Sequence, residues 1–357
     1  MKYPKPLEQK GTIGFVAPSF SCGIEPYRTM FDHGLQKFKD RGHSLDLGPN
    51  CYEERGIGIS NTPKACGEEL TEWYCRKENQ ALISCGGGEL MCEILDYVDF
   101  ERIRAAEPKW YMGFSDNTNF TFLLPTLCDT ASIYGPCAGS FGMEPWDPSI
   151  QDAYDLLLGK KEKIQGYPMW EKSGSDLGMA FKEENPLSPY RLTEQKVLKS
   201  FVGPRPAEPG EELCFQGRLL GGCMDCLVNL IGTEYDRVRE FLKQYQKDGI
   251  VWFLESCDLT VMGMRRAVWQ MKHAGWLQYV KGFLIGRPLH FGEASMGLDH
   301  YRAVWEPLAE YQVPVILDVD LGHLPPMMPV VCGALGKVRV KGNDISIQYK
   351  KEFHRNE

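Results

Sequence analysis

The sequence lacks a long apolar segment and an excess of positive charge. No apolar run approaches the roughly 18 residues that a membrane-spanning helix needs. The 40 Lys and Arg are spread along a chain of net charge -8, which argues against nucleic acid or an anionic membrane as the main partner. The opening MKYPKPLEQKGTIG has no apolar core of the signal-peptide kind. We therefore expect a cytoplasmic protein that acts on small substrates.

A regular cysteine framework is also missing. The 13 cysteines are odd in number and irregularly spaced, and a chain of 357 residues does not need disulfides for stability. Cys223 and Cys226 form a C-x-x-C pair, which leaves a redox pair or half of a zinc site as alternatives, but no second pair follows at zinc-ribbon spacing. The surrounding GRLLGGCMDCLVNLIGT is typical of a glycine turn that enters an apolar helix. We expect most cysteines to be buried small apolar residues.

Length and composition favour two domains. The hydrophobic content of 43% and charged content of 25% describe a chain that buries a large core, and 357 residues exceed the size at which one core stops growing. Between about Gly159 and Pro209 the pattern breaks into Pro-rich, Gly-rich and charged stretches. We predict an N-terminal domain at 1–158, an interdomain crossing or insert at 159–210, and a C-terminal domain at 211–357.

The first half alternates strand and helix signals, as a parallel α/β sheet does. The predicted elements are strands at 12–17, 44–47, 81–84, 110–113 and 132–134, with helices at 26–40 and 63–77. Special turns follow three of the strands, at Gly86-Gly87-Gly88, at Ser115 and at Gly135-Pro136. Ligands bind beyond the carboxyl ends of strands in such sheets, so we expect these turns to converge on one site. The second half predicts strands at 250–254, 282–286 and 313–317 and a hairpin of 337–340 with 345–349.

Ser115 stands where the strand signal of WYMG stops and a helix-capping sequence begins. This layout is typical of a strand-to-helix nucleophile turn, in which following backbone N–H groups point toward an oxyanion. Asn117 occupies the place of the second glycine of the usual G-x-S-x-G pattern. The alternative is that Ser115 is a plain helix N-cap.

A serine nucleophile needs a base and a carboxylate that orients the base. His323 lies in a proline-stiffened loop that leaves a strand, which suits a base, although a loop histidine can equally be a surface residue. Glu255 follows five apolar residues at a buried strand end, where an unpaired charge is costly. It needs a partner, which is either the base or a structural ion pair.

The order Ser115, Glu255, His323 resembles the serine peptidase family that contains muropeptide LD-carboxypeptidases and microcin C self-immunity hydrolases. Seven pieces carry the resemblance in order: GTIGFVAPS, the Gly87-Gly88 turn, GFSDNT, GRLLGGCMDCLVNLIGT, WFLES, FLIGR and GHLPPMMPVVCGA. The resemblance implies a Rossmann-like N-terminal domain with a parallel sheet, a mixed α/β C-terminal domain and a homodimer. It also implies a metal-free, cofactor-free catalytic triad of Ser115, Glu255 and His323 at the domain junction. The implied oxyanion hole consists of the backbone N–H groups of Gly88 and Asp116.

The resemblance implies two substrate classes. One is cytoplasmic murein tetrapeptide, cleaved at its L,D bond to release D-alanine, and this is our first expectation. The other is an acidic aminoacyl group joined to a nucleotide phosphoramidate, which the insert and Tyr134-Gly135-Pro136 favour. Gly87 and Arg287 are expected to bind substrate, although Arg287 could equally pair with an acidic neighbour. Glu89 beside the site could repel an anionic substrate.

Two other functions stay open. His290 and Glu293 have the H-x-x-E spacing of two zinc ligands, with His300, His323 or His354 as the third, although the intervening glycine disfavours a helix. A non-catalytic protein could instead hold a peptide or nucleotide in the interdomain cleft. For the Asp116 side chain we expect a plain role as the cap of its own helix.

Overall fold

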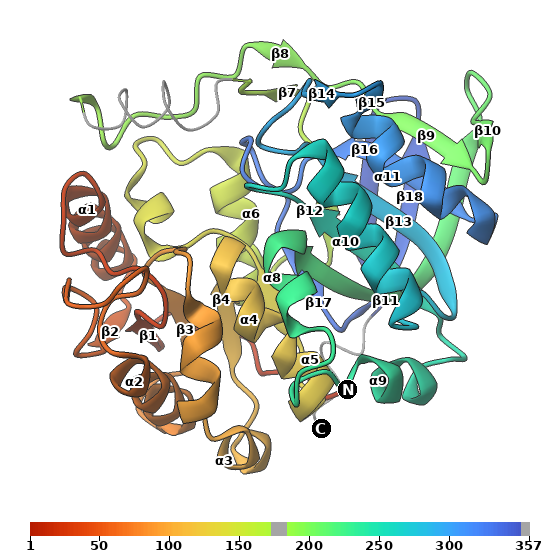
Figure 1. Ribbon diagram of the computed structural model, residues 1–357. Coiled ribbons are helices and arrows are strands. Elements are labelled where there is room, and N and C mark those ends of the chain that lie inside the picture. Colours follow the sequence, from red (N-terminus) through yellow and green to blue (C-terminus); the bar gives the residue numbers. More distant parts are fainter. Residues whose placement is uncertain (173–183, 351–357) are drawn as a thin grey trace.

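A computed structural model describes residues 1–172 and 184–350 (Figure 1). Part of the predicted crossing, 173–183, and the candidate metal ligand His354 lie outside the described residues. In the described part, two large sheets lie side by side, the first mainly in red to yellow and the second mainly in green to blue. No helix there is both long and apolar enough to cross a bilayer.

The first sheet is doubly wound around a parallel core. Its strands, in spatial order, are β17 (Val330–Cys332), β5 (Ser132–Tyr134), β4 (Trp110–Gly113), β3 (Ala81–Ser84), β1 (Thr12–Val16) and β2 (Ser44–Leu47). All neighbouring pairs are parallel except β17 with β5. The parallel order 2-1-3-4-5 reverses direction between β1 and β3, and such a switch point is where ligands bind. The predicted Rossmann-like α/β class is confirmed.

Successive side chains along each strand point to opposite faces of this sheet, and helices cover both faces. Phe15 and Met112 belong to one buried cluster, whereas their neighbours Val16 and Tyr111 belong to the other. One face is covered by α1 (Tyr27–Asp40), η3 (Ala138–Gly142) and α6 (Pro148–Leu157). The opposite face is covered by α2 (Pro63–Cys75), η1 (Met91–Tyr97), α3 (Phe100–Ala105), α4 (Thr118–Thr121) and α5 (Leu123–Cys128).

The second sheet is mixed. Its spatial order is β10 (Arg205–Pro206), β9 (Lys199–Val202), β16 (Pro314–Val319), β13 (Val280–Gly286), β12 (Ile250–Glu255), β11 (Glu212–Cys223), β18 (Leu335–Lys341), β19 (Asp344–Tyr349) and β6 (Lys163–Gln165). The central strands β11, β12, β13 and β16 are parallel, and the predicted hairpin is present as β18 and β19. The remaining elements are α8 (Met224–Leu230), α9 (Val238–Gln244), α10 (Val261–His273), α11 (His300–Leu308), η4 (Ala309–Tyr311), and the ribbons β7 (Met169–Trp170) with β8 (Glu194–Gln195) and β14 (Ala294–Ser295) with β15 (Leu298–Asp299).

Strand membership crosses the predicted segments of the chain. Within 159–210, β6, β9 and β10 join the second sheet, so the described parts of this stretch are built into a sheet. Conversely, β17 from the C-terminal segment extends the first sheet beside β5. Hydrogen bonds between β17 and β5 therefore tie the two halves of the chain together and hold residues from both at one junction.

The glycine pair Gly221-Gly222 is not the predicted turn. Both residues lie in β11, with φ of 153° and 145°. A Cβ at Gly221 would lie 1.7 Å from the carbonyl oxygen of Phe253, and one at Gly222 would lie 2.7 Å from Thr118 Oγ1. The glycines therefore allow β12 and the helix after the nucleophile turn to approach closely. The predicted helix does follow, as α8.

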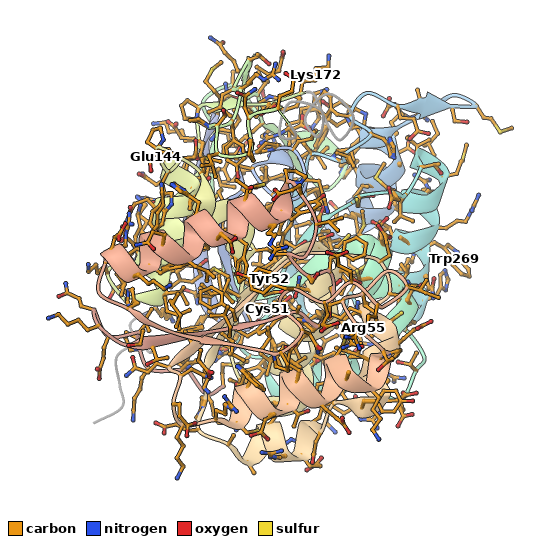
Figure 2. The ribbon with its side chains drawn as sticks, turned by 90° about the vertical axis from the view of Figure 1, so that its left-hand side faces the viewer. Cys51, Tyr52, Arg55, Glu144, Lys172 and Trp269 are labelled. Atoms are coloured by element: carbon orange, nitrogen blue, oxygen red, sulfur yellow. The ribbon has the colours of Figure 1, made fainter. Side chains whose placement is uncertain are left out.

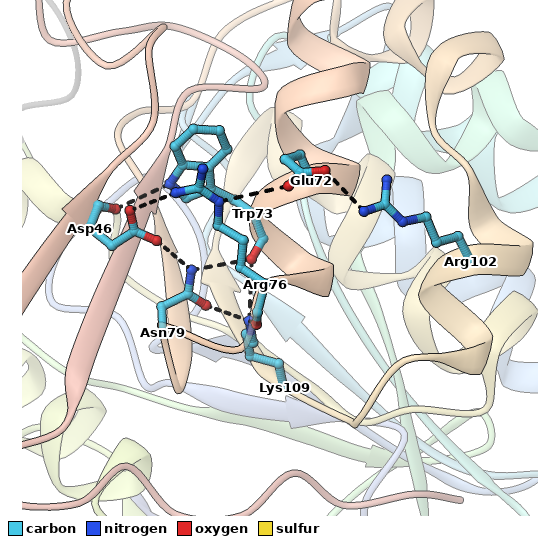
Figure 3. Close-up of polar contacts among 7 residues, drawn as sticks. All are labelled: Asp46, Glu72, Trp73, Arg76, Asn79, Arg102 and Lys109. Atoms are coloured by element: carbon cyan, nitrogen blue, oxygen red, sulfur yellow. Dashed lines mark hydrogen bonds and ion pairs between the residues drawn. The ribbon is translucent and has the colours of Figure 1, made fainter.

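A buried polar cluster joins α2 to β2 and β4 (Figure 3). Lys109 Nζ donates to the carbonyl oxygens of Arg76 at 2.6 Å and Trp73 at 3.2 Å, and also to Asn79 Oδ1. Asn79 Nδ2 donates in turn to Asp46 Oδ2 at 2.8 Å, and Arg76 pairs with Asp46 at 3.1 Å. Burial lowers the pKa of Lys109 to about 8. Lys109, which directly precedes β4, is thus a structural residue that anchors this strand.

Glu69 on α2 holds the loops that follow β1 and β2. Its buried carboxylate accepts hydrogen bonds from the backbone N–H groups of Ala17 at 3.0 Å and Asn50 at 2.8 Å. Burial raises its pKa from the ordinary 4.5 to about 7, against the opposing effect of these hydrogen bonds. The folded protein therefore binds this proton more tightly than the unfolded chain does.

The unfolding free energy should consequently fall as pH rises from about 4.5 to about 7, because Glu69 must then ionise in its buried site. This contribution amounts to about 3 kcal/mol. Glu69→Gln should remove this contribution. Urea denaturation should then show that the difference in unfolding free energy between variant and wild type changes by about this amount across the pH range. A difference that stays constant with pH would contradict the assignment.

Candidate active site

Ser115 stands on a strained turn at the carboxyl end of β4. Its φ of 61° lies in the left-handed region, which non-glycine residues seldom adopt and which is found at nucleophile turns. Its backbone N–H donates to the hydroxyl of Tyr134 at 3.1 Å. The short helix η2 (Ser115–Asn117) has no side-chain N-cap. Ser115 is thus not the plain N-cap of the alternative interpretation.

His323 connects Ser115 to Glu255. His323 Nε2 lies 2.8 Å from Ser115 Oγ, and His323 Nδ1 lies 2.8 Å from Glu255 Oε2. A proton on Nδ1 satisfies both contacts, because Nδ1 then donates to the carboxylate while Nε2 accepts the serine hydroxyl proton. Glu255 ends β12, and His323 follows β16 in the next loop. Three residues far apart in the sequence thereby form one hydrogen-bonded chain.

The charges of this chain are coupled. Burial would lower the pKa of His323, but the Glu255 carboxylate and contact with Cys257 outweigh it and raise the pKa well above the ordinary 6.5. Burial would likewise raise the pKa of Glu255, but the His323 charge and hydrogen bonds lower it. Glu255 is 1% exposed, so the imidazole is its compensating partner. This pairing answers the question of what neutralises the carboxylate at the end of β12.

Two further residues hold Glu255 in place, and sequence reasoning missed both. The Tyr134 hydroxyl donates to Glu255 Oε1 at 2.5 Å. Gly322, with φ of 93°, brings the histidine loop so close that a Cβ there would lie 2.5 Å from Glu255 Oε2. The available signals were a tyrosine closing a buried strand and a glycine directly before the loop histidine.

Tyr134→Phe should lower kcat/KM about tenfold and the unfolding free energy by about 1–3 kcal/mol, because one oxygen of the buried Glu255 loses its donor. Steady-state kinetics and urea denaturation measure the two effects. Tyr154→Phe is the matched control, since its hydroxyl bonds to His43 at 2.7 Å, away from Ser115. Tyr154→Phe should lower the unfolding free energy but leave kcat/KM unchanged. Unchanged kinetics in Tyr134→Phe would contradict this role.

The two backbone N–H groups expected to form the oxyanion hole are those of Gly88 and Asp116. In the described part of the chain, neither the Gly88 N–H nor the Asp116 N–H donates a hydrogen bond, whereas the N–H of Asn117 bonds to Phe114. A Cβ at Gly87 would lie 3.3 Å from Ser115 Cβ, and one at Gly88 would lie 2.1 Å from Ser19 Oγ. Glycine therefore lets this backbone pass close to Ser115 at position 87 and close to Ser19 at position 88.

The Asp116 side chain does not cap its own helix, which corrects our expectation. It accepts hydrogen bonds from Ser19 Oγ at 2.5 Å, from the N–H of Met91 at 2.9 Å and from Asn119 Nδ2 at 3.1 Å. The carboxylate instead links the loops after β1 and β3 to the nucleophile turn. Two tertiary donors and the nearby Asn119 amide compete better for this buried group than a backbone N–H of its own helix does.

Asn117 explains the missing second glycine. Its Nδ2 donates to the carbonyl oxygens of Gly86 at 2.8 Å and Phe114 at 3.1 Å. A Cβ at Gly113 would lie 2.7 Å from Asn117 Cγ, so the first glycine of the pattern makes room for this side chain. Asn117 thus fixes the glycine-rich turn against the nucleophile turn.

Two of the three predicted turns, Gly86-Gly87-Gly88 and Ser115, meet at one cavity, and Pro136 of the third borders a second cavity. A cavity of about 470 Å³ is bordered by Ser115 and His323 and by residues from the loops after β1, β2 and β3. A second cavity of about 200 Å³ also borders His323 and Phe114 and includes Tyr190. Cavities of this combined size accommodate a small peptide or conjugate.

Arg287 forms the ion pair that was its alternative interpretation. It is 1% exposed, donates to Asp320 Oδ1 at 2.7 Å and to the Asp318 carbonyl at 2.7 Å, and borders neither cavity. It stabilises the ends of β13 and β16, and substrate contact by Arg287 is not supported. Glu89, by contrast, is exposed next to Gly88.

The described residues contain no arrangement that favours a metal site or a redox pair. Within the described ranges, no three or more His, Cys, Asp or Glu side chains group in a way that could hold a metal ion. His290 is exposed in the loop after β13. Cys223 and Cys226 both have raised pKa values. The thiol contact and burial raise the pKa of Cys223. For Cys226 the thiol contact lowers the pKa, but burial and the nearby carboxylates together outweigh it. Such neutral thiols are poor nucleophiles and poor metal ligands.

Residues 13–135 match the LD-carboxypeptidase N-terminal domain and residues 216–338 match the LD-carboxypeptidase C-terminal domain. A Vibrio cholerae protein that is provisionally named a carboxypeptidase is 23% identical over 342 residues, or 95% of each chain. A similarly named Streptomyces coelicolor protein is 23% identical and covers 92% of this chain and 91% of its own length.

Solved structures agree with the fold. The microcin C7 self-immunity protein MccF in complex with aspartyl sulfamoyl adenosine is 22% identical, with a TM-score of 0.77 over 98% of this chain and 99% of that chain. An MccF-like protein from Bacillus anthracis is 20% identical, with a TM-score of 0.76 over 98% and 100%. The two domain models together span most of the sequence. The chain therefore belongs to the LD-carboxypeptidase family of serine peptidases.

Proposed function

We propose that this chain hydrolyses an amide bond of a small peptide with Ser115 as nucleophile, His323 as general base and acid, and Glu255 as the group that orients the base. The observation that carries the proposal is the continuous chain of two 2.8 Å contacts from Ser115 Oγ through His323 to Glu255. Its position beside a cavity at the switch point of the first sheet adds support.

In the first half-reaction His323 Nε2 takes the proton of the Ser115 hydroxyl while Oγ bonds to the substrate carbonyl carbon. The carbonyl oxygen becomes an oxyanion that accepts hydrogen bonds from the N–H groups of Gly88 and Asp116. Collapse of this intermediate breaks the C–N bond, and His323 gives its proton to the leaving amine. The acyl group stays esterified to Ser115.

In the second half-reaction water attacks the ester and His323 takes the water proton. The same backbone donors stabilise the second oxyanion. Collapse breaks the bond to Oγ, the proton returns to Ser115, and the acid product leaves. Glu255 stays ionised throughout, because it stabilises the imidazolium that forms twice in each turnover.

For the substrate we propose the L,D bond of cytoplasmic murein tetrapeptide, with release of D-alanine. The family membership and the names of the curated relatives support a carboxypeptidase. An aminoacyl or peptidyl nucleotide conjugate is the second candidate, because MccF, solved with aspartyl sulfamoyl adenosine, shares the fold over nearly the whole chain.

Mass spectrometry of products decides between them. Wild type and Ser115→Ala are each incubated with a murein tetrapeptide and with aspartyl sulfamoyl adenosine. D-alanine release by wild type alone supports the carboxypeptidase, and cleavage of the conjugate alone supports the second candidate. Inactivity on both, together with no labelling of Ser115 by a fluorophosphonate, would overturn the proposed chemistry.

We also propose a cytoplasmic homodimer. All 13 cysteines are free, which suits a reducing compartment. Light scattering of the purified chain measures its mass, and a value near 40.5 kDa instead of twice that value would contradict the dimer.

A further inference from the structure

The cavity beside Ser115 combines apolar walls with carboxylates. Its residues come from the loops after the first four strands and from the histidine loop. The apolar members are Phe20, Ile24, Tyr27, Ile59 and Phe114, and the acidic members are Glu53 and Glu54. No Lys or Arg of the described chain borders it. The group that this cavity accepts must suit both kinds of surface.

Three of the apolar side chains remain open to solvent at the cavity. Phe20 is 43% exposed, Ile24 is 54% exposed and Tyr27 is 38% exposed. Large apolar side chains gathered around a concavity mark a surface that a ligand covers. Aromatic rings also attract cations through their π-faces. These walls therefore favour an apolar chain or ring, with or without a positive charge.

The acidic side chains determine which charge the cavity favours. Glu54 is exposed and makes no ion pair with any described residue. Glu53 pairs with Arg55 at 2.8 Å, but the Arg55 side chain is 76% exposed. Figure 2 shows Arg55 near Tyr52 on the face that carries α1 and α2. The cavity thus retains at least one carboxylate that no cation neutralises.

A third carboxylate, that of Glu89, follows the cavity residue Gly88 directly in the chain. The pKa of Glu89 is raised by burial and then by the nearby charges of Asp258, Asp116 and Asp225. The charge of His323 acts in the opposite direction, but burial and these carboxylates outweigh it. Arg287, the one cation considered earlier for anion binding, is committed to Asp320. A substrate carboxylate in this cavity would meet repulsion.

We infer that the cavity selects a substrate portion that is apolar and carries an ammonium or similar cation. The inference rests on the proposed amide hydrolysis at Ser115 and names the class of group that lies beside the scissile carbonyl. The apolar part packs on Phe20, Ile24 and Tyr27, and the cation lies near Glu54. An acidic aminoacyl group is excluded from this position.

Fluorophosphonates with tails of equal length test the selection. The tails end in an ammonium, a methyl or a carboxylate group, and intact-mass spectrometry gives the rate constant for labelling of Ser115. We expect the cationic probe to react on the order of tenfold faster than the neutral one, and the anionic probe on the order of tenfold slower. Both ratios should shrink as ionic strength rises. Equal rates, or a faster anionic probe, would overturn the inference.

Substitutions test whether Glu54 causes the faster labelling by the cationic probe. Glu54→Gln should reduce the ratio of cationic to neutral rates to about twofold, since it removes the unpaired charge and keeps the shape. Glu107→Gln is the matched control, because Glu107 is exposed, pairs with Lys5 at 2.7 Å and lies outside the cavity. A ratio unchanged in Glu54→Gln would contradict the assignment.

The neutral probe separates this inference from the proposed function. If it labels Ser115, the nucleophile stands, and the charge ratios alone decide the selection. If no probe labels Ser115, the proposed chemistry fails, and ligand-observed NMR on Ser115→Ala still tests the cavity. In that experiment 4-phenylbutylamine should bind more tightly than 4-phenylbutyrate, and the reverse order would overturn the inference.

Discussion

Ser115→Ala should reduce turnover of any amide substrate on the order of 10⁶-fold and abolish fluorophosphonate labelling. The Ser115 hydroxyl lies 2.8 Å from His323 Nε2, and alanine leaves no atom to form the acyl-enzyme. Backbone donors at Gly88 and Asp116 remain, so a residual rate above the uncatalysed reaction should persist. Steady-state kinetics and circular dichroism measure activity and fold together.

Ser295→Ala serves as the matched control for this experiment. Ser295 lies in β14 and borders neither cavity. The Ser295→Ala substitution therefore removes the same hydroxyl oxygen from a position without a role in the reaction. It should keep wild-type turnover. Substantial turnover by pure Ser115→Ala would contradict the mechanism, because no other hydroxyl lies in hydrogen-bond contact with His323 in the described chain.

Glu255→Gln should lower kcat on the order of 10⁴-fold with little change in shape. The amide removes the charge that stabilises the His323 imidazolium, and its NH₂ group can donate to Nδ1, which stabilises the tautomer that cannot accept the serine proton. Substrate binding should change far less than kcat does, because Glu255 is buried behind the histidine. Steady-state kinetics separates the two parameters.

The pH profile gives a second readout for the same variant. Only neutral His323 accepts the proton of Ser115, and Glu255 raises the pKa of His323 well above 6.5. Wild-type kcat/KM should therefore fall as the pH decreases through this raised pKa. Removing the carboxylate charge should shift this limb to lower pH. Glu310→Gln, on the surface and paired with Lys272, is the control that should leave it in place. A limb that does not move in Glu255→Gln would contradict the coupling.

Local patterning was sufficient to predict most strands and the nucleophile turn. Strands such as Ile250–Glu255 are continuous apolar runs bounded by turn residues, and their signal depends only on neighbours in the chain. The strand-to-helix step at Ser115 is equally local. The Gly221-Gly222 pair misled us because glycine that allows close backbone approach has the same sequence signature as glycine in a turn.

The partners of polar groups could not be predicted in this way. Arg287 follows a strand end and could have faced a ligand or an acid, and only the packing of β13 beside β16 brings it to Asp320. The same holds for the Asp116 carboxylate, whose donors come from loops about 25 and 97 residues away. Tyr134 likewise meets Glu255 across 121 residues.

Sequence was therefore enough for the element types, the fold class and the identity of Ser115, Glu255 and His323 as candidates, because these depend on short-range periodicity and on family motifs. The tertiary structure alone decided which of these side chains touch. Hydrogen bonds require heavy atoms within about 3 Å, and that separation is set by the register and packing of strands from both sheets. The 2.8 Å contacts from His323 to Ser115 and Glu255 exist because β4, β12 and β16 end at one junction.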